Sequence, residues 1–356
     1  MKVIFVVPNL GPGGAERVIS ILSNSFVEND IDVDIFLLRD NRISYQLSER
    51  VNIVYFNIDL LSCAARVSCR IMREYFKNQK RNNDKVIIIP FLDTCLKHVL
   101  VSSIGLKIPV IASERNDPYQ KGTSLISRIK ANIPYLLASC CVFQTKGAKE
   151  YYCGWVRRKG HIIMNPLIIG EDVEWQGQTS KHIVSVGRLE PQKNQLLLID
   201  AFSHIHNEYP EYILEIYGEG TLREKLKQRI EALGLGEVVF LCGHSPDIQN
   251  VLVNAYLFVL PSDYEGMSNA LIEALSIGMP VVTTDHPCGG ARMLVDNGIN
   301  GILVPVKHER AMICAVKNML ENQAFASQIG KEAYKVRELL SVQKITKEWL
   351  NVIESM

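Results

Sequence analysis

The sequence predicts an α/β protein with two domains of similar size, each built on a parallel sheet with helices on both faces. Apolar segments of strand length alternate with amphipathic segments of helical length along almost the whole chain. Most of the apolar segments run into a glycine-rich or polar loop, as happens at the carboxyl ends of strands in βαβ units. The pattern stops in a polar stretch between residues 165 and 180 and then restarts.

Composition indicates a globular protein that stays inside the cell. The 356 residues, 47% apolar and 22% charged, suffice for two hydrophobic cores. The longest apolar run, His98 to Ala112, is interrupted by Lys107 and Pro109, so no segment is expected to span a bilayer. Met1 leads directly into a strand without a signal-peptide cleavage site, and the nine cysteines lack paired metal-binding spacing. We therefore expect a cytoplasmic protein without a disulfide framework.

The charge is divided unevenly between the two halves. Residues 1–160 hold 23 Lys/Arg and 14 Asp/Glu, a net charge of +9. The remainder holds 39 − 23 = 16 Lys/Arg and 38 − 14 = 24 Asp/Glu, a net charge of −8. This asymmetry indicates that the halves meet different partners.

Two basic segments give the N-terminal half a possible lipid-binding surface. Residues 60–85 have helical periodicity, with basic side chains at steps of three and four: Arg66, Arg70, Arg73, Lys77 and Arg81. Trp155, followed by the basic residues 157–159, forms a second patch. A solvated helix face is one interpretation, and adhesion to anionic lipid headgroups is the other. No nucleic-acid recognition motif accompanies the charge, so nucleic acid is not an expected partner.

The first predicted domain, residues 1–168, opens with the strand Val3–Val7 and a glycine loop. Gly13 and Gly14 precede a helix predicted over Ala15–Glu28, and such a loop either contacts a phosphate or makes a tight βα turn. Glu16 departs from the dinucleotide pattern G-x-G-x-x-G, which argues against a dinucleotide site.

The next strand, Ile31–Leu38, alternates polar and apolar residues. We expect Asp32 and Asp34 on its solvated face and Ile31, Val33 and Ile35 in the core. The D-x-D pattern is therefore not interpreted as a metal site, and no metal is expected.

Polar clusters follow two further strands of this domain. Asp93 comes after Val86–Ile89, and Glu114 and Arg115 come after Val110–Ala112. Because the carboxyl ends of parallel strands meet at one edge, these side chains are expected to line the same cleft as the glycine loop. Asp93 and Glu114 are candidate acid/base or substrate-binding groups, or caps of the segments that follow. The strands 142–145 and 162–165 complete the domain.

A linker over residues 169–180 is expected to lead to a second domain, residues 181–337. Its predicted strands include His182–Val186, Tyr212–Tyr217 and Val238–Leu241, followed respectively by the loops 187–194, 218–220 and 242–244. The segment 338–356 is amphipathic and is expected to return to the first domain as a helix.

The stretch 256–294 carries the strongest ligand-binding pattern. A strand, Leu257–Leu260, leads through the loop 261–266 to a helix from about Ser268 to Ile277, which Gly278 and Pro280 end. The free N–H groups at that helix N-terminus favour a phosphate. Glu265 in the loop and Glu273 on the second turn flank this anion site, as suits the hydroxyl groups of a nucleotide sugar.

Three motifs lie at strand–loop junctions: Gly13-Gly14-Ala15-Glu16-Arg17, Gly187-Arg188-Leu189 with Lys193, and the pair Glu265 and Glu273 eight residues apart. In this order and at these positions, they resemble the motifs of the retaining glycosyltransferases of family four (group 1). The resemblance covers nearly the whole chain. It implies the GT-B architecture, in which two Rossmann-like domains face each other across a cleft.

The resemblance also implies roles for the donor-side residues. Arg188 and Lys193 would neutralise the donor diphosphate as it leaves, with no metal ion or other cofactor required. Glu273 would bind the ribose, and Glu265 would lie near the donor sugar as a further catalytic group. The remaining donor contacts would come from Gly13, Gly14, Gly218, Glu219, His244, Gly266, Met267, Ser268 and Asn269.

The segments that contain Asp93, Glu114 and Arg115 look like a bacterial subgroup that acts on lipid-linked or surface polysaccharide intermediates. Many family members carry a histidine in this region. In this sequence the region contains Asp93 and His98. The resemblance implies a UDP-sugar donor and a polyprenyl-diphosphate-linked acceptor.

We therefore expect a retaining hexosyl- or N-acetylhexosaminyltransferase of surface polysaccharide biosynthesis, such as O-antigen or capsule. The basic N-terminal domain would attach it peripherally to the inner face of the plasma membrane. Two alternatives stay open: a non-hydrolysing UDP-sugar epimerase, which shares this architecture, and a non-catalytic two-domain sugar-binding protein.

Overall fold

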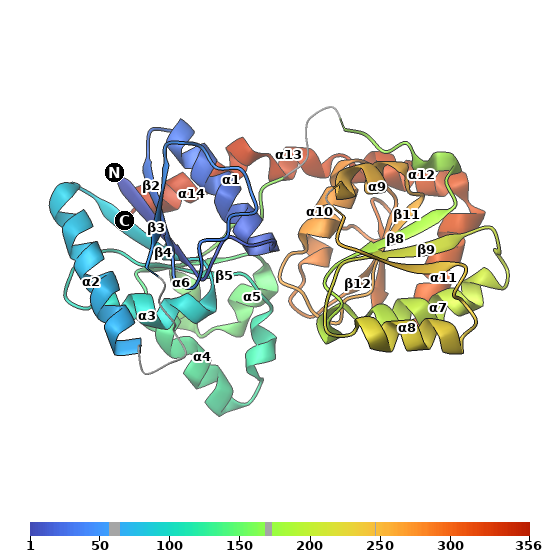
Figure 1. Cartoon of the computed structure of the whole chain (residues 1–356), viewed down its shortest axis with the longest axis horizontal. Coiled ribbons are helices and arrows are strands. Elements are labelled where there is room, and N and C mark those ends of the chain that lie inside the picture. The colour runs from blue at the N-terminus through green and yellow to red at the C-terminus, as the bar shows by residue number, and fades with distance from the viewer. Residues whose placement is uncertain (57–64, 168–172, 246) are drawn as a thin grey trace. The chain divides into compact units, whose positions relative to one another are not determined.

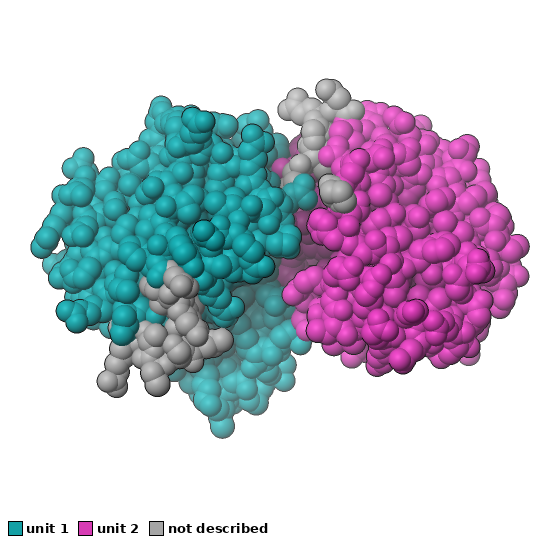
Figure 2. Space-filling view, in the orientation of Figure 1, with its two compact units in different colours: residues 1–166, 340–356 teal, residues 167–339 magenta. Residues whose placement is uncertain are grey.

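The computed structural model describes residues 1–56, 65–167, 173–245 and 247–356. The chain divides into two compact units (Figures 1 and 2). Unit 1 comprises Met1–Pro166 and Leu340–Met356, and unit 2 comprises Leu167–Leu339. Every strand pairing within the named sheets is parallel, and helices cover the sheets, so the predicted α/β class with two Rossmann-like domains is confirmed. Part of the predicted linker, residues 169–172, lies outside the described residues.

The main sheet of unit 1 has the strand order β3-β2-β1-β4. A parallel bridge from Ile88 to Val110 leads on to a second sheet, β5-β6-β7. The strands are β1 (Lys2–Val7), β2 (Asp32–Leu37), β3 (Val51–Tyr55), β4 (Val86–Pro90), β5 (Ile111–Glu114), β6 (Cys140–Phe143) and β7 (Gly160–Ile162).

Six helices of unit 1 connect or cover these strands. They are α1 (Gly14–Glu28), α2 (Ala65–Asn82), α3 (Asp93–Ser103), α4 (Leu125–Leu137), α5 (Lys146–Tyr151) and α6 (Gly154–Arg158). Within the range predicted as one helix, 60–85, Leu60, Leu61 and Ala64 lie outside the described residues. Strand β3 and the helices α3 to α6 are not among the elements that the sequence analysis predicts.

The expectation for Asp34 is wrong. Its side chain is fully buried, accepts hydrogen bonds from Lys2 Nζ at 3.0 Å and Asn52 Nδ2 at 3.1 Å, and is bonded to the Tyr75 hydroxyl. Strand β2 lies inside the sheet, and the Tyr75 side chain of α2 covers the face that the alternation assigned to solvent. Asp32, at the start of the strand, is exposed as predicted.

Unit 2 has one sheet of six parallel strands in the order β10-β9-β8-β11-β12-β13. The strands are β8 (His182–Val186), β9 (Ile213–Tyr217), β10 (Val239–Gly243), β11 (Leu257–Leu260), β12 (Val281–Asp285) and β13 (Ile302–Pro305). The helices are α7 (Gln195–His206), α8 (Arg223–Ala232), α9 (Ile248–Asn254), α10 (Asn269–Ser276), α11 (Glu309–Glu321), α12 (Gln323–Ala333) and α13 (Val336–Leu340).

The direction in which strands are added reverses between β8 and β11, and ligands of open α/β sheets bind at such a point. Strand β11, helix α10 and strand β12 form the predicted βαβ unit. Gly278 ends α10 with φ +77°, and Met279 N–H donates to Ala274 O at 3.1 Å. The loops that follow β8 and β11 therefore meet where the topology favours a ligand.

The chain ends in unit 1 with helix α14 (Val342–Glu354). This helix lies against α1, where Thr346 Oγ1 donates to Ser25 Oγ at 2.9 Å. The fully buried Trp349 stacks on Phe91, with ring centroids 6.3 Å apart. The C-terminal segment thus completes the core of the first domain.

Candidate active site

Three glycines mark the carboxyl ends of neighbouring strands in unit 2. Gly187 N–H donates to Tyr217 O at 2.9 Å, and Gly218 N–H donates to Gly243 O at 2.7 Å. Gly218 has φ +140°, and a Cβ atom there would lie 2.1 Å from Gly187 O. Only glycine allows the backbones of β8, β9 and β10 to approach one another so closely at this edge.

The loop that follows β8 carries the two predicted phosphate-binding cations. Arg188 is exposed, and its Nη2 donates to Gln192 Oε1 at 3.4 Å. Lys193 is largely buried, with 14% of its side chain exposed. Asn194 ends the loop in the left-handed region, at φ +46°, and its Nδ2 donates to Asp263 Oδ1 at 2.8 Å. This bond ties the loop to the segment that follows β11.

Glu265 is held by three donors in the same unit. It forms an ion pair with Lys193 and accepts hydrogen bonds from Ser262 Oγ at 2.8 Å and Gln192 Nε2 at 3.2 Å. Gln192 also donates to Tyr264 O at 3.0 Å. The Gln192 side-chain amide therefore accepts a hydrogen bond from Arg188 and donates one to Glu265. The three predicted catalytic residues thus form one connected cluster.

Helix α10 begins directly after this cluster. Ser268 is its N-cap residue and makes no capping hydrogen bond with its side chain. Gly266, Met267 and Ser268 are buried, Asn269 is half-buried, and Glu273 on the second turn is buried with 5% exposure. The helix N-terminus lies beside Glu265, where its dipole favours an anion.

His286 joins this site from the loop after β12. A Cβ atom on Gly290 would lie 1.9 Å from Gly266 O and 3.3 Å from His286 Cε1, so the three residues are in close contact. His286 is 1% exposed, and neither ring nitrogen has a hydrogen-bond partner among the described residues. Burial lowers the pKa of His286 below its ordinary value, and the charges of Glu265 and Asp285 oppose the shift only in part. The imidazole is therefore neutral.

Glu219 and His244, two of the predicted donor contacts, lie at the far side of the same edge. Glu219 follows β9 and pairs with Arg223 at 3.2 Å, and Arg223 Nη2 also donates to Leu241 O at 3.0 Å. His244 is exposed after β10. Both side chains lie at the carboxyl ends of their strands, but neither touches the cluster around Glu265.

The predicted glycine loop of unit 1 lies between β1 and α1. Gly13 is the N-cap residue of α1, and its carbonyl accepts from the Tyr45 hydroxyl at 3.0 Å. A Cβ atom on Gly13 would lie 2.0 Å from Glu16 Oε2, so the Glu16 carboxylate folds back over this glycine. Gly14 is the first residue of the helix. The loop thus presents backbone at the carboxyl end of β1.

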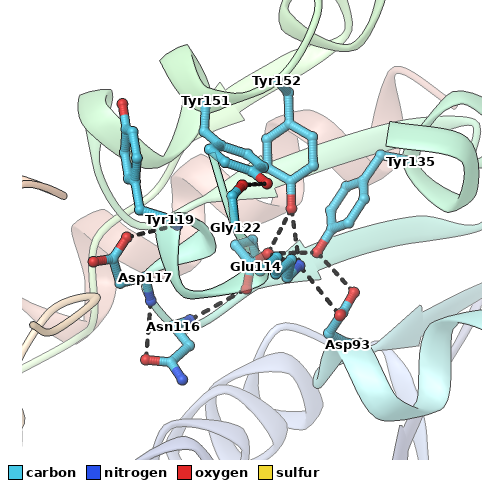
Figure 3. A network of polar contacts seen from close by, with 10 residues as sticks. Asp93, Glu114, Asn116, Asp117, Tyr119, Gly122, Tyr135, Tyr151 and Tyr152 are labelled. Atoms are coloured by element: carbon cyan, nitrogen blue, oxygen red, sulfur yellow. Dashed lines mark hydrogen bonds and ion pairs between the residues drawn. The ribbon is translucent and has the colours of Figure 1, made fainter. Parts of the chain in front are cut away.

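The acceptor-side candidate Glu114 is the centre of the polar network in Figure 3. Its side chain is 2% exposed and accepts from the hydroxyls of Tyr152 at 2.6 Å and Tyr135 at 2.9 Å, and from Lys121 Nζ at 2.5 Å. Burial alone would lower the pKa of Lys121, but Glu114 and Asp93 raise it above its ordinary value. Burial next to Glu114 raises the pKa of both tyrosines. Glu114 is therefore a fixed internal anion with little capacity left for an acceptor.

Asp93 is the part of this network that reaches solvent. It lies in the first turn of α3, with 42% of its side chain exposed. Lys121 pairs with it at 3.1 Å, and the Tyr135 hydroxyl donates to it at 3.3 Å. The Glu114 network thus holds an accessible carboxylate in one orientation at the carboxyl end of β4.

Arg115 points into unit 1 and contacts its C-terminal helix. The guanidinium carbon lies 4.1 Å from the Phe91 ring centroid and 5.3 Å from that of Trp349. Arg115 also donates to Ser113 Oγ at 2.7 Å and Asn165 Oδ1 at 3.3 Å. Burial lowers the pKa of Arg115 to about 9, against the opposing charge of Glu114, so the side chain stays cationic at neutral pH.

Comparison with known proteins identifies the family. The sequence model described as "Glycosyl transferases group 1" matches residues 173–336. The chain is 30% identical to a Campylobacter jejuni protein over 92% of this chain and 91% of that protein, named N-acetylgalactosamine-N,N'-diacetylbacillosaminyl-diphospho-undecaprenol 4-alpha-N-acetylgalactosaminyltransferase. The chain belongs to the group 1 glycosyltransferases.

A second Campylobacter jejuni relative is 26% identical over 99% of this chain and 98% of its own length. Its name is GalNAc-alpha-(1->4)-GalNAc-alpha-(1->3)-diNAcBac-PP-undecaprenol alpha-1,4-N-acetyl-D-galactosaminyltransferase. Among solved structures, Anabaena Alr3699/HepE in complex with UDP and glucose matches with a TM-score of 0.84 at 18% identity, over 100% of both chains. The outer core galactosyltransferase WaaB matches with a TM-score of 0.77 at 19% identity, over 100% of this chain and 99% of the other. These structures share the fold of this glycosyltransferase.

Two residues of the donor-side cluster are absent from the sequence-based prediction. Gln192 lies between Arg188 and Lys193 in a recognised loop, and a buried amide there could have been suspected from its position alone. His286 gives no such signal, because its neighbours Glu265 and Gly290 come from other parts of the chain and only the fold brings them together.

Proposed function

We propose that this glycosyltransferase moves a hexose or N-acetylhexosamine from a UDP-sugar to a polyprenyl-diphosphate-linked glycan, with retention of configuration. It would work at the inner face of the plasma membrane in the synthesis of a bacterial surface polysaccharide. The observation that carries the donor half of the proposal is the cluster of Arg188, Gln192, Lys193 and Glu265 beside the N-terminus of α10.

The cluster supports departure of a diphosphate leaving group. As the bond between the sugar and the diphosphate breaks, negative charge grows on the phosphate oxygens, and preorganised cations lower the energy of that state. Lys193 has three donors, so it can keep its contact with Glu265 and still bind a phosphate oxygen. Arg188 is exposed enough to add a planar, bidentate contact.

Glu265 and Glu273 would bind hydroxyl groups of the donor. A carboxylate accepts hydrogen bonds from two neighbouring hydroxyls of a sugar or ribose without itself changing charge. Glu265 keeps its position through three internal donors, which suits a positioning role better than a proton-transfer role. We propose that these residues and the two cations suffice without a metal ion.

The acceptor half rests on the relatives. Two Campylobacter jejuni proteins that match over nearly their full lengths carry diphospho-undecaprenol acceptors in their names. On this chain, Asp93 is the accessible carboxylate at the carboxyl edge of the unit 1 sheet, and we propose that it binds the acceptor hydroxyl. No helix among the described residues is long and apolar enough to cross a bilayer.

The sequence leaves two other functions open, a UDP-sugar epimerase and a sugar-binding protein. A UDP-sugar epimerase would release UDP or change the sugar without any acceptor, and a binding protein would do neither. Membership in a family of transferases, with full-length relatives that carry transferase names, favours transfer over both.

The test is the release of UDP from UDP-sugars by purified enzyme, with and without an undecaprenyl-diphosphate-linked oligosaccharide. Release that requires the acceptor is expected, and acceptor-independent conversion would refute the proposal. In Arg188→Ala, kcat/KM should fall about 30-fold or more, because one charged transition-state contact contributes about 2–4 kcal/mol. Arg229→Ala is the matched control, since Arg229 lies on α8 and pairs with Asp200 at 2.6 Å outside the cluster.

A further inference from the structure

Helix α4 exposes an unusual amount of apolar surface. Six large aliphatic side chains on its thirteen residues are exposed to solvent: Leu125, Ile126, Ile129, Ile133, Leu136 and Leu137. At 100° per residue they fall within one arc of about 120°. The buried residues Asn132, Pro134 and Tyr135 all lie outside this arc. An isolated exposed leucine is ordinary, but a continuous stripe of this size marks an interaction surface.

A second helix, α6, is fixed next to α4. Asn132 Nδ2 donates to Arg128 O at 2.7 Å, and its Oδ1 accepts from Cys153 N–H, the N-cap of α6, at 2.8 Å. Lys159 Nζ donates to Leu136 O at 2.8 Å, at the end of α4. The two helices therefore present one rigid surface, which we call the α4–α6 surface. Figure 1 shows α4 at the lower edge of unit 1.

Trp155 on α6 gives this surface an exposed aromatic side chain. It is 73% exposed, and the Arg158 guanidinium lies 5.2 Å from its ring centroid. Tryptophan next to arginine is typical of the boundary between lipid headgroups and acyl chains, because the ring has an apolar body and a polar N–H group.

The charge around the α4–α6 surface is strongly positive. Residues 122–159 contain seven Lys/Arg and a single acidic residue, Glu150. Lys130, Arg157 and Arg158 are exposed. Such a surface is complementary to an anionic bilayer. Two copies of it facing each other would place like charges together, which disfavours a symmetric dimer through the same surface.

Two cations of α2 are used inside unit 1, while Arg70 and Arg81 of the same helix stay exposed. Arg73 Nη1 donates to the carbonyls of Ser102, at 3.2 Å, and Ile104, and Lys80 donates to the carbonyl of Leu106. These two cations join α2 to the end of α3, and their charge serves the fold of unit 1.

We propose that the α4–α6 surface docks this enzyme on an anionic phospholipid bilayer. The aliphatic arc of α4 would enter the headgroup–acyl boundary, Trp155 would lie at the headgroups, and the neighbouring cations would contact lipid phosphates. The proposal rests on the proposed function in so far as a lipid-linked acceptor gives the enzyme a reason to bind there. It names a site for that contact which differs from α2.

The three tryptophans of the chain allow a direct test. Trp349 and Trp175 are buried, at 0% and 8% exposure, so a change in tryptophan emission upon addition of vesicles reports Trp155. With vesicles of phosphatidylcholine and phosphatidylglycerol, the emission of the full-length enzyme should shift to the blue, and brominated lipids should quench it. Trp155→Phe should abolish the shift while most of the enzyme still sediments with the vesicles.

The double variant Ile129→Asp/Ile133→Asp should lower vesicle binding by about tenfold or more, since it removes apolar area and adds two anions. Ile299→Asp is the matched control: Ile299 is an isoleucine of unit 2 that is 58% exposed, and its replacement should leave binding unchanged. Ile129→Ala/Ile133→Ala, which keeps the helix and its charge, should give a smaller loss. Circular dichroism checks the fold of each variant.

Absence of vesicle binding by the unmodified enzyme would overturn the proposal, as would equal binding by the Ile129→Asp/Ile133→Asp variant and the Ile299→Asp control. A dimer in lipid-free solution that this double variant dissociates, without any vesicle binding, would assign the surface to a second copy instead. The assay contains no sugar nucleotide. Binding without transfer would therefore refute only the proposed function, and transfer without binding would refute only the docking surface.

Discussion

Replacing Lys193 with methionine separates the folding role of this residue from its proposed chemical role. Methionine has a similar length but no charge, so the Glu265 carboxylate would lose its ion-pair partner. The Lys193 and Glu265 side chains are only 14% and 9% exposed, so we treat them as a buried ion pair. Removing one partner of a buried pair typically costs about 3–5 kcal/mol. Ser262 and Gln192 still donate to Glu265, so we expect the lower end, about 3 kcal/mol.

A second substitution, Glu265→Gln, removes the uncompensated charge. The double variant Lys193→Met/Glu265→Gln should therefore recover most of the stability and lie within about 1 kcal/mol of the unmodified enzyme. Transfer should not recover, because the proposed leaving-group cation and the Glu265 carboxylate are both absent. We expect kcat/KM to fall about 30- to 900-fold in Lys193→Met, which corresponds to about 2–4 kcal/mol, and at least as far in the double variant.

The assay follows hydrogen exchange of peptides from α7 and α10 in urea, which reports the unfolding of unit 2 separately from unit 1. Transfer is measured by UDP release in the presence of acceptor. A single variant as stable as the unmodified enzyme, or a double variant as unstable as the single one, would contradict the buried-pair reasoning. Recovery of transfer in the double variant would contradict both proposed roles, that of Lys193 as a leaving-group cation and that of Glu265 as a donor ligand.

Two further predictions concern unit 2. The pKa of His286 is lower in the folded protein than the value of 6.5 expected in the unfolded chain. Below pH 6.5 the unfolded chain therefore binds more protons than the folded one, and unit 2 should lose stability as the pH falls. His286→Leu should reduce that loss and leave stability at neutral pH equal or higher, since it removes two buried nitrogens that have no hydrogen-bond partner in the described part of the chain. An unchanged pH profile in hydrogen exchange would contradict this. Gly218→Ala should destabilise unit 2 by more than about 2 kcal/mol, because its Cβ would lie 2.1 Å from Gly187 O. Gly234→Ala also has a positive φ but no neighbouring atom within 4 Å, so it should cost only about 1 kcal/mol, and equal thermal shifts for the two variants would refute the close-approach argument.

The donor-side loops could be predicted from the sequence because their structure is local. Gly278 and Pro280 end helix α10 through backbone geometry within a few residues, and the alternation of strand and helix places Arg188 and Glu265 at strand ends. The roles of Gln192 and His286 could not be predicted in the same way. Gln192 bonds to Glu265 across 73 positions of sequence, and only the strand order β8-β11-β12 brings such residues together.

The burial of carboxylates in unit 1 also depends on contacts between distant parts of the chain. Strict alternation around Asp34 predicts a solvated carboxylate, but Lys2, Asn52 and Tyr75 surround it from three other elements. Glu114 likewise follows a strand as a ligand-binding carboxylate would, yet the tyrosines at 135 and 152 enclose it. Whether a carboxylate at a strand end faces solvent depends on helices that pack there later in the chain.

The sequence by itself determined the α/β class, the two domains, the loops that carry the cations and carboxylates, and the resemblance to the family. These follow from periodicity and from short motifs, which act over one turn or one loop. The tertiary structure decided which of those groups are buried, which are tied together, and which apolar face stays exposed. The aliphatic residues of α4 have the composition of a core helix, and only the packing of its opposite side against unit 1 leaves them at the surface.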